Sequence, residues 1–154
     1  MQKFLTEKEQ QWAKSTFEKL DQKLKKECER IGNKIPYIPE NGHYEQDLGE
    51  SDIAWWTNGF WGGLMWQMYH ATGDEVYKEK AENPRYMEIA RYSEEALDQC
   101  FEQFMGLHHD VGFMWMHTAV ADYRLTGSHH SLVRGRHAAN LLAGRFNILG
   151  NFIR

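Results

Sequence analysis

The chain has 154 residues, of which 42% are hydrophobic and 26% charged, and its formal net charge is −4. These values are typical of one ordinary globular domain, and the acidic balance gives no basic surface for nucleic acid. No stretch approaches 18 uninterrupted apolar residues and no apolar segment follows a basic start, so we expect no membrane partner and a cytoplasmic location.

The first predicted helix covers residues 6–31. Thr6 and Glu9 have the spacing of a capping box, and Gly32 marks the end of the helix. Apolar residues at helical spacing define one face of it, and they are Ala13, Phe17, Leu20, Leu24, Cys28 and Ile31. From there to about Ile53, scattered proline and glycine with little periodicity predict a long loop, a feature that is often functional.

Four further helices follow the loop. The second begins at Thr57 or Asn58 and ends at Thr72. The third starts at Asp74, is interrupted or kinked at Pro84, and runs to about Met105, with an apolar stripe of Ile89, Ala96, Leu97, Cys100 and Phe104.

The fourth helix extends from Asp110 to Gly127. The fifth is capped by Ser128 and has a stripe of Leu132, Ala139, Leu142 and Phe146. No segment predicts a strand, so the expected class is all-α with about five helices. Cys28 and Cys100 lack CxxC spacing and are expected to be reduced core residues.

Two of these helices repeat a pattern. Residues 59–73 (GFWGGLMWQMYHATG) and 112–127 (GFMWMHTAVADYRLTG) both begin with Gly-Phe and end with Tyr-x-x-Thr-Gly, and their tyrosines, Tyr69 and Tyr123, are 54 residues apart. Each segment is apolar nearly all round, and the helix after it is amphipathic. A repeated αα-hairpin of this kind indicates a stacked or toroidal helical array.

A helix that is apolar on every side must be covered on every side, and three amphipathic neighbours cannot easily cover two such helices. A closed ring of six hairpins at this period would need about 324 residues. We therefore expect an incomplete (α/α)6 toroid in which residues 1–154 are the N-terminal part of a barrel domain, with self-association through the uncovered surface. The alternative is a self-contained five-helix bundle.

Residues 108–117 (HHDVGFMWMH) combine titratable and apolar side chains. Asp110 suits an acid/base or ligand-binding role, but an aspartate before an apolar run is also a common N-cap. The adjacent His108 and His109 with His117 lack the i, i+4 spacing of paired metal ligands, so no metal is expected. The tryptophans 55, 61, 66 and 115 are expected to be core residues.

Three stretches resemble the unsaturated glucuronyl hydrolases, glycoside hydrolase family 88: WTNGFWGGLMWQMYHATGDEVY (56–77), HHDVGFMW (108–115) and AANLLAGRFN (138–147). The resemblance covers about residues 50–154. It implies an (α/α)6 barrel whose inner helices line a pocket, in agreement with the repeat.

The resemblance also implies a reaction and a substrate. An aspartate protonates the double bond of a 4,5-unsaturated uronic acid at the end of an oligosaccharide, water adds at C5, and the hemiketal opens and expels the remaining sugars. The substrates are lyase products of glycosaminoglycan-type polymers, and the family uses no metal or organic cofactor.

Specific residues follow from the same resemblance. Asp110 matches one of two active-site aspartates, His109 matches its neighbour in the pocket, and Trp56 and Phe60 match aromatics that pack on the unsaturated ring. Asn58 is an open choice between a helix cap and a pocket residue. Gly59 and Gly112 are expected to leave space for a ligand.

The family's other aspartate, which transfers the proton, lies beyond residue 154, so the chain alone is expected to be inactive. Two alternatives remain open from the sequence. One is a non-catalytic helical-repeat module that binds a protein or a sugar. The other is the related unsaturated rhamnogalacturonyl hydrolase, which the HHDVGF and WTNGFW motifs make the less favoured of the two enzyme families.

Overall fold

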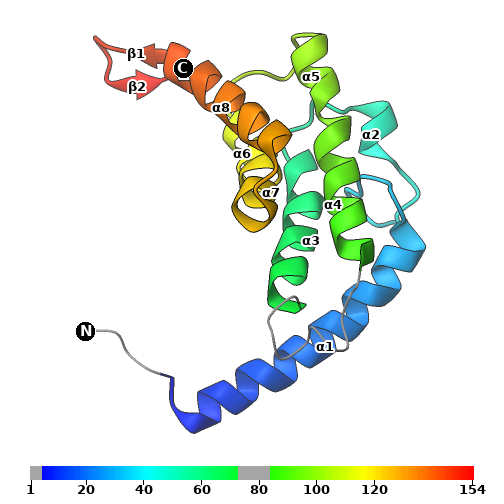
Figure 1. Cartoon of the computed structure of the whole chain (residues 1–154). Helices are drawn as coiled ribbons and strands as arrows, with labels where there is room; N and C mark the ends of the chain where they lie inside the picture. The colour runs from blue at the N-terminus through cyan, green and yellow to red at the C-terminus, as the bar shows by residue number, and fades with distance from the viewer. Residues whose placement is uncertain (1–4, 73–83) are drawn as a thin grey trace. The chain divides into compact units, whose positions relative to one another are not determined.

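The computed structural model describes residues 5–72 and 84–154, and the chain divides into two compact units, residues 1–32 and 33–154 (Figure 1). The first unit contains α1 (Glu7–Ile31), which starts with the predicted capping box: the Thr6 side chain accepts a hydrogen bond from the Glu9 backbone, and the Glu9 carboxylate accepts one from the Thr6 backbone N–H. Both ends of the predicted first helix are thus confirmed to within one residue.

The predicted long loop contains a short helix, α2 (Leu48–Ser51). Asp47 caps it, and the same Asp47 Oδ1 accepts hydrogen bonds from the backbone nitrogens of Ile35 at 2.9 Å and Gly49 at 2.8 Å. Because one carboxylate joins the start of the loop to its end, the segment is ordered by its own contacts. Periodicity analysis missed α2, since four residues are too few to show a period.

The second unit is built on α3 (Asn58–Thr72), α4 (Pro84–Ala96) and α5 (Asp98–Glu102). The predicted start at Asp74 lies outside the described residues. Pro84 begins α4, where its missing N–H costs nothing, and does not interrupt a described helix. Ile89, Leu97 and Cys100 of the predicted stripe are buried, but Phe104 is 77% exposed, because a backbone with positive φ (54°) follows the end of α5.

The predicted fourth helix is broken into α6 (Val111–Trp115) and α7 (Ala119–Thr126). Its sequence is one residue longer than the matching segment of α3, and the irregular turn at Met116–Thr118 takes up the difference. The prediction of one continuous helix was therefore wrong, although the cap at Ser128 and the next helix, α8 (His129–Gly144), are confirmed.

The buried face of α8 differs from the predicted one. Ser131, Gly135 and Ala138 are buried, whereas Ala139 and Phe146 are exposed. A β-carbon on Gly135 would lie 2.9 Å from Val120 Cγ2, so small residues allow α8 to approach α7 closely. Hydrophobicity alone points to the larger side chains and misses such a contact.

A small hairpin follows α8. Strands β1 (Phe146–Asn147) and β2 (Phe152–Ile153) are antiparallel, with Phe146 opposite Ile153 and Asn147 opposite Phe152. Asn147 Oδ1 accepts a hydrogen bond from the Gly150 backbone at 2.8 Å and so supports the turn. The expectation of no strand was wrong at this point, because two-residue strands are set by the turn and carry no alternation of their own.

Within the second unit, α3 packs against α4 on one side and against α6 and α7 on the other, and α8 covers α6 and α7 (Figure 1). Buried apolar helices therefore alternate with outer ones, as the repeat predicts. The main core lies where they meet and consists of Ile35, Leu48, Ile53, Leu97, Cys100, Leu107, Val111, Met114, Trp115, Ala119 and Ala138.

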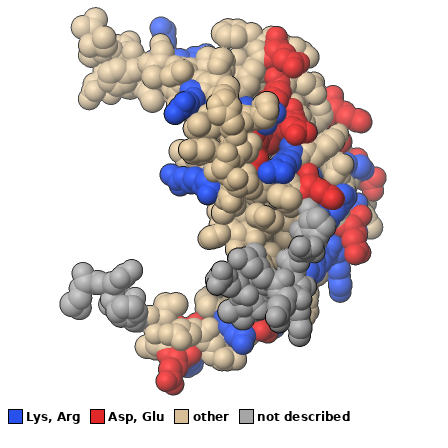
Figure 2. Space-filling model, in the orientation of Figure 1, with Lys and Arg blue, Asp and Glu red and all other residues tan. Residues whose placement is uncertain are grey.

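The surface follows the same division. Figure 2 shows acidic side chains along α4 and α5, whereas the visible surface of α8 and the hairpin is mostly uncharged. Among the described residues, no helix is long and apolar enough to cross a membrane.

Candidate active site

Asp110 occupies the position immediately before α6 but does not cap it. Its φ and ψ are −87° and 0°, and its side chain accepts no hydrogen bond from the first turn of the helix. The carboxylate is 21% exposed. Asp110 therefore occupies the N-cap position, but its side chain does not cap the helix and is available for other contacts.

Two histidines flank this carboxylate. Asp110 Oδ2 lies 3.5 Å from His108 Nδ1 and 3.4 Å from His109 Nε2. The two imidazole rings are 5.1 Å apart between centroids, and the backbone N–H of Val111 donates to the carbonyl of His108, which closes a tight turn. This turn brings the side chains of His108 and His109 to the same oxygen atom, Asp110 Oδ2, although the two histidines are adjacent in the sequence.

The segment that begins at Asp110 also contributes to an aromatic wall, which is formed by Trp56, Phe60, Phe113 and His117. Trp56 and Phe60 make an edge-to-face contact with centroids 5.8 Å apart, and Phe113 lies 5.5 Å from Trp56 and 6.0 Å from Phe60. His117 adds a fourth ring, 5.2 Å from Phe60. Asp110 immediately precedes α6, and its carbonyl accepts a hydrogen bond from the backbone N–H of Phe113 at 2.9 Å, so the same turn positions Asp110 and one ring of the wall.

Sequence reasoning missed Phe113 and His117 as members of this wall. The signal for Phe113 was present, because it occupies the same place in the repeat as Phe60. Both rings remain partly open to solvent, with Phe60 40% and Phe113 43% exposed. Exposed aromatic rings of this kind suit the apolar faces of a sugar ring.

Asn58, which lies between Trp56 and Phe60 in the sequence, is fully buried. Its side-chain nitrogen donates to the carbonyl oxygens of Asp52 and Ile53, each at 2.9 Å, while its Oδ1 has no hydrogen-bond partner among the described residues. The structure thus gives Asn58 the task of fixing the turn that carries Trp56. Direct contact of Asn58 with a substrate stays a prediction.

The two glycines behave differently. A β-carbon on Gly59 would lie 2.3 Å from the carbonyl oxygen of Phe113, so the space beside Gly59 is filled by the backbone of α6 and not left for a ligand. That expectation was wrong for Gly59. At Gly112 the nearest atom would be Leu142 Cδ1 at 3.6 Å, which is an ordinary contact.

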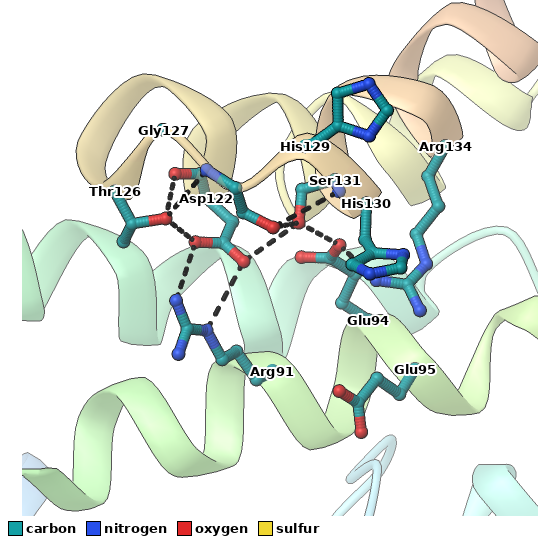
Figure 3. Close-up of a pocket in the computed structure, with 11 residues that line it drawn as sticks. Arg91, Glu94, Glu95, Asp122, Thr126, Gly127, His129, His130, Ser131 and Arg134 are labelled. Carbon is teal, nitrogen blue, oxygen red and sulfur yellow. Dashed lines mark hydrogen bonds and ion pairs between the residues drawn. The ribbon is translucent and has the colours of Figure 1, made fainter.

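A cavity of about 600 Å³ lies between α4, α7 and the start of α8 (Figure 3). The Ser131 hydroxyl lies 2.7 Å from Glu94 Oε1 and 2.9 Å from Asp122 Oδ2, and it has one proton for the two oxygens. Burial raises the pKa of Glu94, the nearby Asp122 raises it further, and hydrogen bonds from Ser131 and Arg134 oppose this.

None of the predicted site residues lines this cavity. It adjoins Thr126 at the end of α7, whereas Asp110 precedes α6, so the two lie at opposite ends of the same inner segment. A second cavity of about 600 Å³ lies between α3 and α7 and includes His117. Of the two, the second adjoins the aromatic wall.

No protein-family model matches the chain. Several curated relatives do. The chain is 28% identical over 118 residues to the unsaturated glucuronyl hydrolase of Bacillus sp. (strain GL1), covering 76% of this chain and 28% of that protein. It is 33% identical over 104 residues to the unsaturated chondroitin disaccharide hydrolase of Streptococcus agalactiae serotype III (strain NEM316), covering 67% of this chain and 24% of that protein. The chain thus spans about a quarter of their length.

A solved structure gives the same relationship. It holds an Asp-to-Asn variant of an unsaturated glucuronyl hydrolase with dGlcA-Glc-Rha-Glc, and it matches 78% of this chain and 29% of its own at 25% identity, with a TM-score of 0.62. Such structures have an α/α-toroid fold, which confirms the predicted fold class and the predicted resemblance.

Proposed function

From its homology to unsaturated glucuronyl hydrolases, we propose that this chain is the N-terminal part of the (α/α)6 catalytic domain of such an enzyme. The enzyme removes 4,5-unsaturated glucuronic acid from lyase-generated glycosaminoglycan-type oligosaccharides by hydrating the double bond. The observation that carries the proposal is the partly buried Asp110 carboxylate, which caps no helix and immediately precedes the helix that supplies Phe113 to the aromatic wall of Trp56, Phe60 and Phe113. The cytoplasmic location expected from the sequence belongs to the same proposal and rests on the sequence alone.

Each side chain then has a physical task. Trp56 and Phe60 pack on the unsaturated sugar ring. This contact removes water from the aromatic side chains and from the apolar face of the sugar. Asp110 accepts hydrogen bonds from sugar hydroxyls, and His109 lies close enough to hold the carboxylate in place or to add a donor of its own. Proton transfer to the double bond is assigned to a second aspartate outside these residues.

The exposed apolar side chains of the inner helices support the domain proposal. Phe60 and Leu64 are exposed on α3, and Phe113, Met116 and Tyr123 are exposed on the α6–α7 segment. In a closed ring, neighbouring helices cover such residues. For the 154-residue chain by itself we propose self-association through this surface, and light scattering after size-exclusion chromatography would contradict it by showing a monodisperse monomer.

The activity is tested in the complete enzyme and in this chain with a lyase-generated unsaturated chondroitin disaccharide, following the loss of ultraviolet absorbance of the double bond. We expect the complete enzyme to be active, Asp110→Asn to abolish turnover, and the 154-residue chain to be inactive. Since the Asp110 side chain caps no helix, the variant should keep its thermal midpoint. Turnover by Asp110→Asn at the native rate, or none by the complete enzyme, would contradict the proposal.

A further inference from the structure

A second pair of aromatic side chains includes the residue next to Trp56 in the sequence. The rings of Tyr37 and Trp55 meet edge to face, with centroids 5.8 Å apart and an interplanar angle of 73°. Tyr37 is 40% exposed and Trp55 36%, so the expectation that Trp55 is a core residue was wrong. In an edge-to-face pair the rings cover little of each other's faces, so aromatic surface remains in contact with water.

Main-chain hydrogen bonds fix the backbone at both members of the pair. Ile35, two residues before Tyr37, donates its N–H to Asp47 Oδ1 at 2.9 Å. The N–H of Trp55 donates to the Asp52 carbonyl at 3.1 Å. Because the backbone at each ring is already ordered, a ligand that binds the pair pays little for ordering the protein.

The polar atoms of the pair are available for a ligand. Among the described residues, neither the Tyr37 hydroxyl nor the Trp55 indole N–H has a hydrogen-bond partner. Each ring therefore presents to solvent both an apolar surface and a hydrogen-bonding atom. Sugars have the complementary combination, since they carry apolar C–H faces and hydroxyl groups around the ring.

The pair and the aromatic wall share a backbone anchor but not a ring contact. Trp55 and Trp56 are adjacent, so their Cα atoms are about 3.8 Å apart. Trp56 contacts Phe60 and Phe113, whereas Trp55 contacts Tyr37, and no ring contact joins the two groups in the part of the chain that the structure describes. Two separate aromatic surfaces at neighbouring positions suit different sugars of one extended chain.

We propose that Tyr37 and Trp55 form an outer subsite that binds a sugar of the leaving chain, beyond the first two sugars of the substrate. This inference rests on the proposed function, in which the unsaturated uronic acid packs on Trp56 and Phe60. A disaccharide has only one sugar after the unsaturated ring, and a longer oligosaccharide has further sugars that extend away from the wall. The subsite therefore selects for chain length, and its ligand is an oligosaccharide of three or more sugars.

The test compares unsaturated chondroitin disaccharide and tetrasaccharide as substrates of the complete enzyme, with initial rates followed by the loss of ultraviolet absorbance. Trp55→Ala and Tyr37→Ala should each raise the ratio of the tetrasaccharide KM to the disaccharide KM at least about fivefold, because only the longer substrate reaches the pair. Trp55→Phe, which keeps an aromatic ring, should restore most of this ratio.

The matched control is Tyr92→Ala on α4, because Tyr92 is also an exposed aromatic residue, at 49%, and has no ring contact among the described residues. It should keep the ratio of the unmodified enzyme. An unchanged ratio in both Trp55→Ala and Tyr37→Ala would overturn the subsite. An equal rise in KM for both substrates would also overturn it, since loss of loop structure alone produces that result.

Failure of the proposed function is recognised separately, because the complete enzyme would then hydrolyse no unsaturated disaccharide. In that case calorimetric titration of the complete enzyme with a saturated chondroitin hexasaccharide decides the subsite. Binding that weakens at least about fivefold in Trp55→Ala and not in Tyr92→Ala supports an oligosaccharide site at the pair. Equal binding by Trp55→Ala and the unmodified enzyme, or no binding by either, overturns it.

Discussion

Gly59 of α3 packs so closely on Phe113 of α6 that a β-carbon at residue 59 would lie 2.3 Å from the Phe113 carbonyl oxygen and 2.5 Å from that of Met114. Both obstacles are backbone atoms of a neighbouring helix, so neither can move away by a change of rotamer. This contact sets the separation of the two inner helices, and with it the place of Phe60 and Phe113 in the aromatic wall.

We expect Gly59→Ala to lower the free energy of unfolding by about 3 kcal/mol or more, because the helices must separate to admit the methyl group. Urea unfolding followed by circular dichroism measures the loss. The matched control is Gly112→Ala on α6, where the new β-carbon meets only Leu142 Cδ1 at 3.6 Å. That variant should be neutral or slightly stabilised, since alanine favours a helix over glycine. Equal stabilities for the two variants would show that the inner helices are not in close contact.

Arg134 joins α8 to α4 and α5. Its guanidinium donates to Glu94 Oε1 at 2.9 Å and binds Asp98 through two nitrogens. Glu94 is 1% exposed, so Arg134→Met leaves a buried carboxylate without its cation and should cost about 2–3 kcal/mol at neutral pH. Arg85→Met, which removes an exposed pair with Glu88 at 3.5 Å, should cost less than about 0.5 kcal/mol. Chemical denaturation measures the free energy of unfolding of both variants. A similarly small loss of stability in each would refute the structural role of Arg134.

The same network predicts a pH dependence. Burial raises the pKa of Glu94 in the folded protein, whereas in the unfolded chain this carboxyl titrates near its ordinary value of 4.5. Between the two pKa values the folded state holds a proton that the unfolded state has released. The contribution of Glu94 to stability is therefore fully present below pH 4.5 and is lost as the pH rises through the raised pKa.

Glu94→Gln should flatten this part of the stability profile, because glutamine is uncharged at every pH. The measurement is the free energy of unfolding from pH 4 to pH 8 in the unmodified chain and in the variant. Glu95→Gln changes the exposed neighbour on the same helix and should keep the slope of the unmodified chain. A variant profile parallel to that of the unmodified chain would mean that Glu94 does not retain its proton on folding.

Cys100 should be unreactive in the folded protein. Burial, with a smaller contribution from Asp52, raises the pKa of its thiol from 9.0 to about 11, and its Sγ donates to the Ile53 carbonyl at 3.5 Å. Two pKa units reduce the thiolate at pH 8 about 100-fold, so alkylation of Cys100 by iodoacetamide should slow by at least that factor relative to the unfolded chain. Peptide mapping by mass spectrometry gives the rate at this residue, and equal rates in urea and in buffer would contradict its burial.

The sequence predicted those parts of the fold that long apolar periods and caps determine. The box at Thr6 and Glu9, the repeat that defines α3 and the α6–α7 segment, and the cap at Ser128 are all confirmed. It failed where the deciding contact involves small or polar atoms. Gly135 of α8 packs on α7 although hydrophobicity points elsewhere, and Asp47 orders a loop that has no period at all.

The candidate site divides in the same way. The motifs point to Asp110, Trp56 and Phe60, but they cannot show whether an asparagine or a glycine faces a pocket or a neighbouring helix. Asn58 binds two loop carbonyls, and Gly59 receives the backbone of α6. Such roles depend on contacts with other segments, and residue type carries little information about them.

Two adjacent tryptophans provide the sharpest test of the aromatic wall. Trp56 contacts Phe60 and Phe113, whereas the ring of Trp55 lies 5.8 Å from Tyr37 of the preceding loop. In the complete enzyme, Trp56→Ala should raise KM for an unsaturated disaccharide about tenfold or more, because loss of one sugar-stacking ring removes roughly 1–2 kcal/mol of binding. Trp55→Ala, which removes a ring of the same size one residue away, should leave KM within about twofold. Initial rates over a range of disaccharide concentrations separate KM from kcat, and an equal rise in KM for both variants would mean that the wall supports the fold and does not contact the sugar.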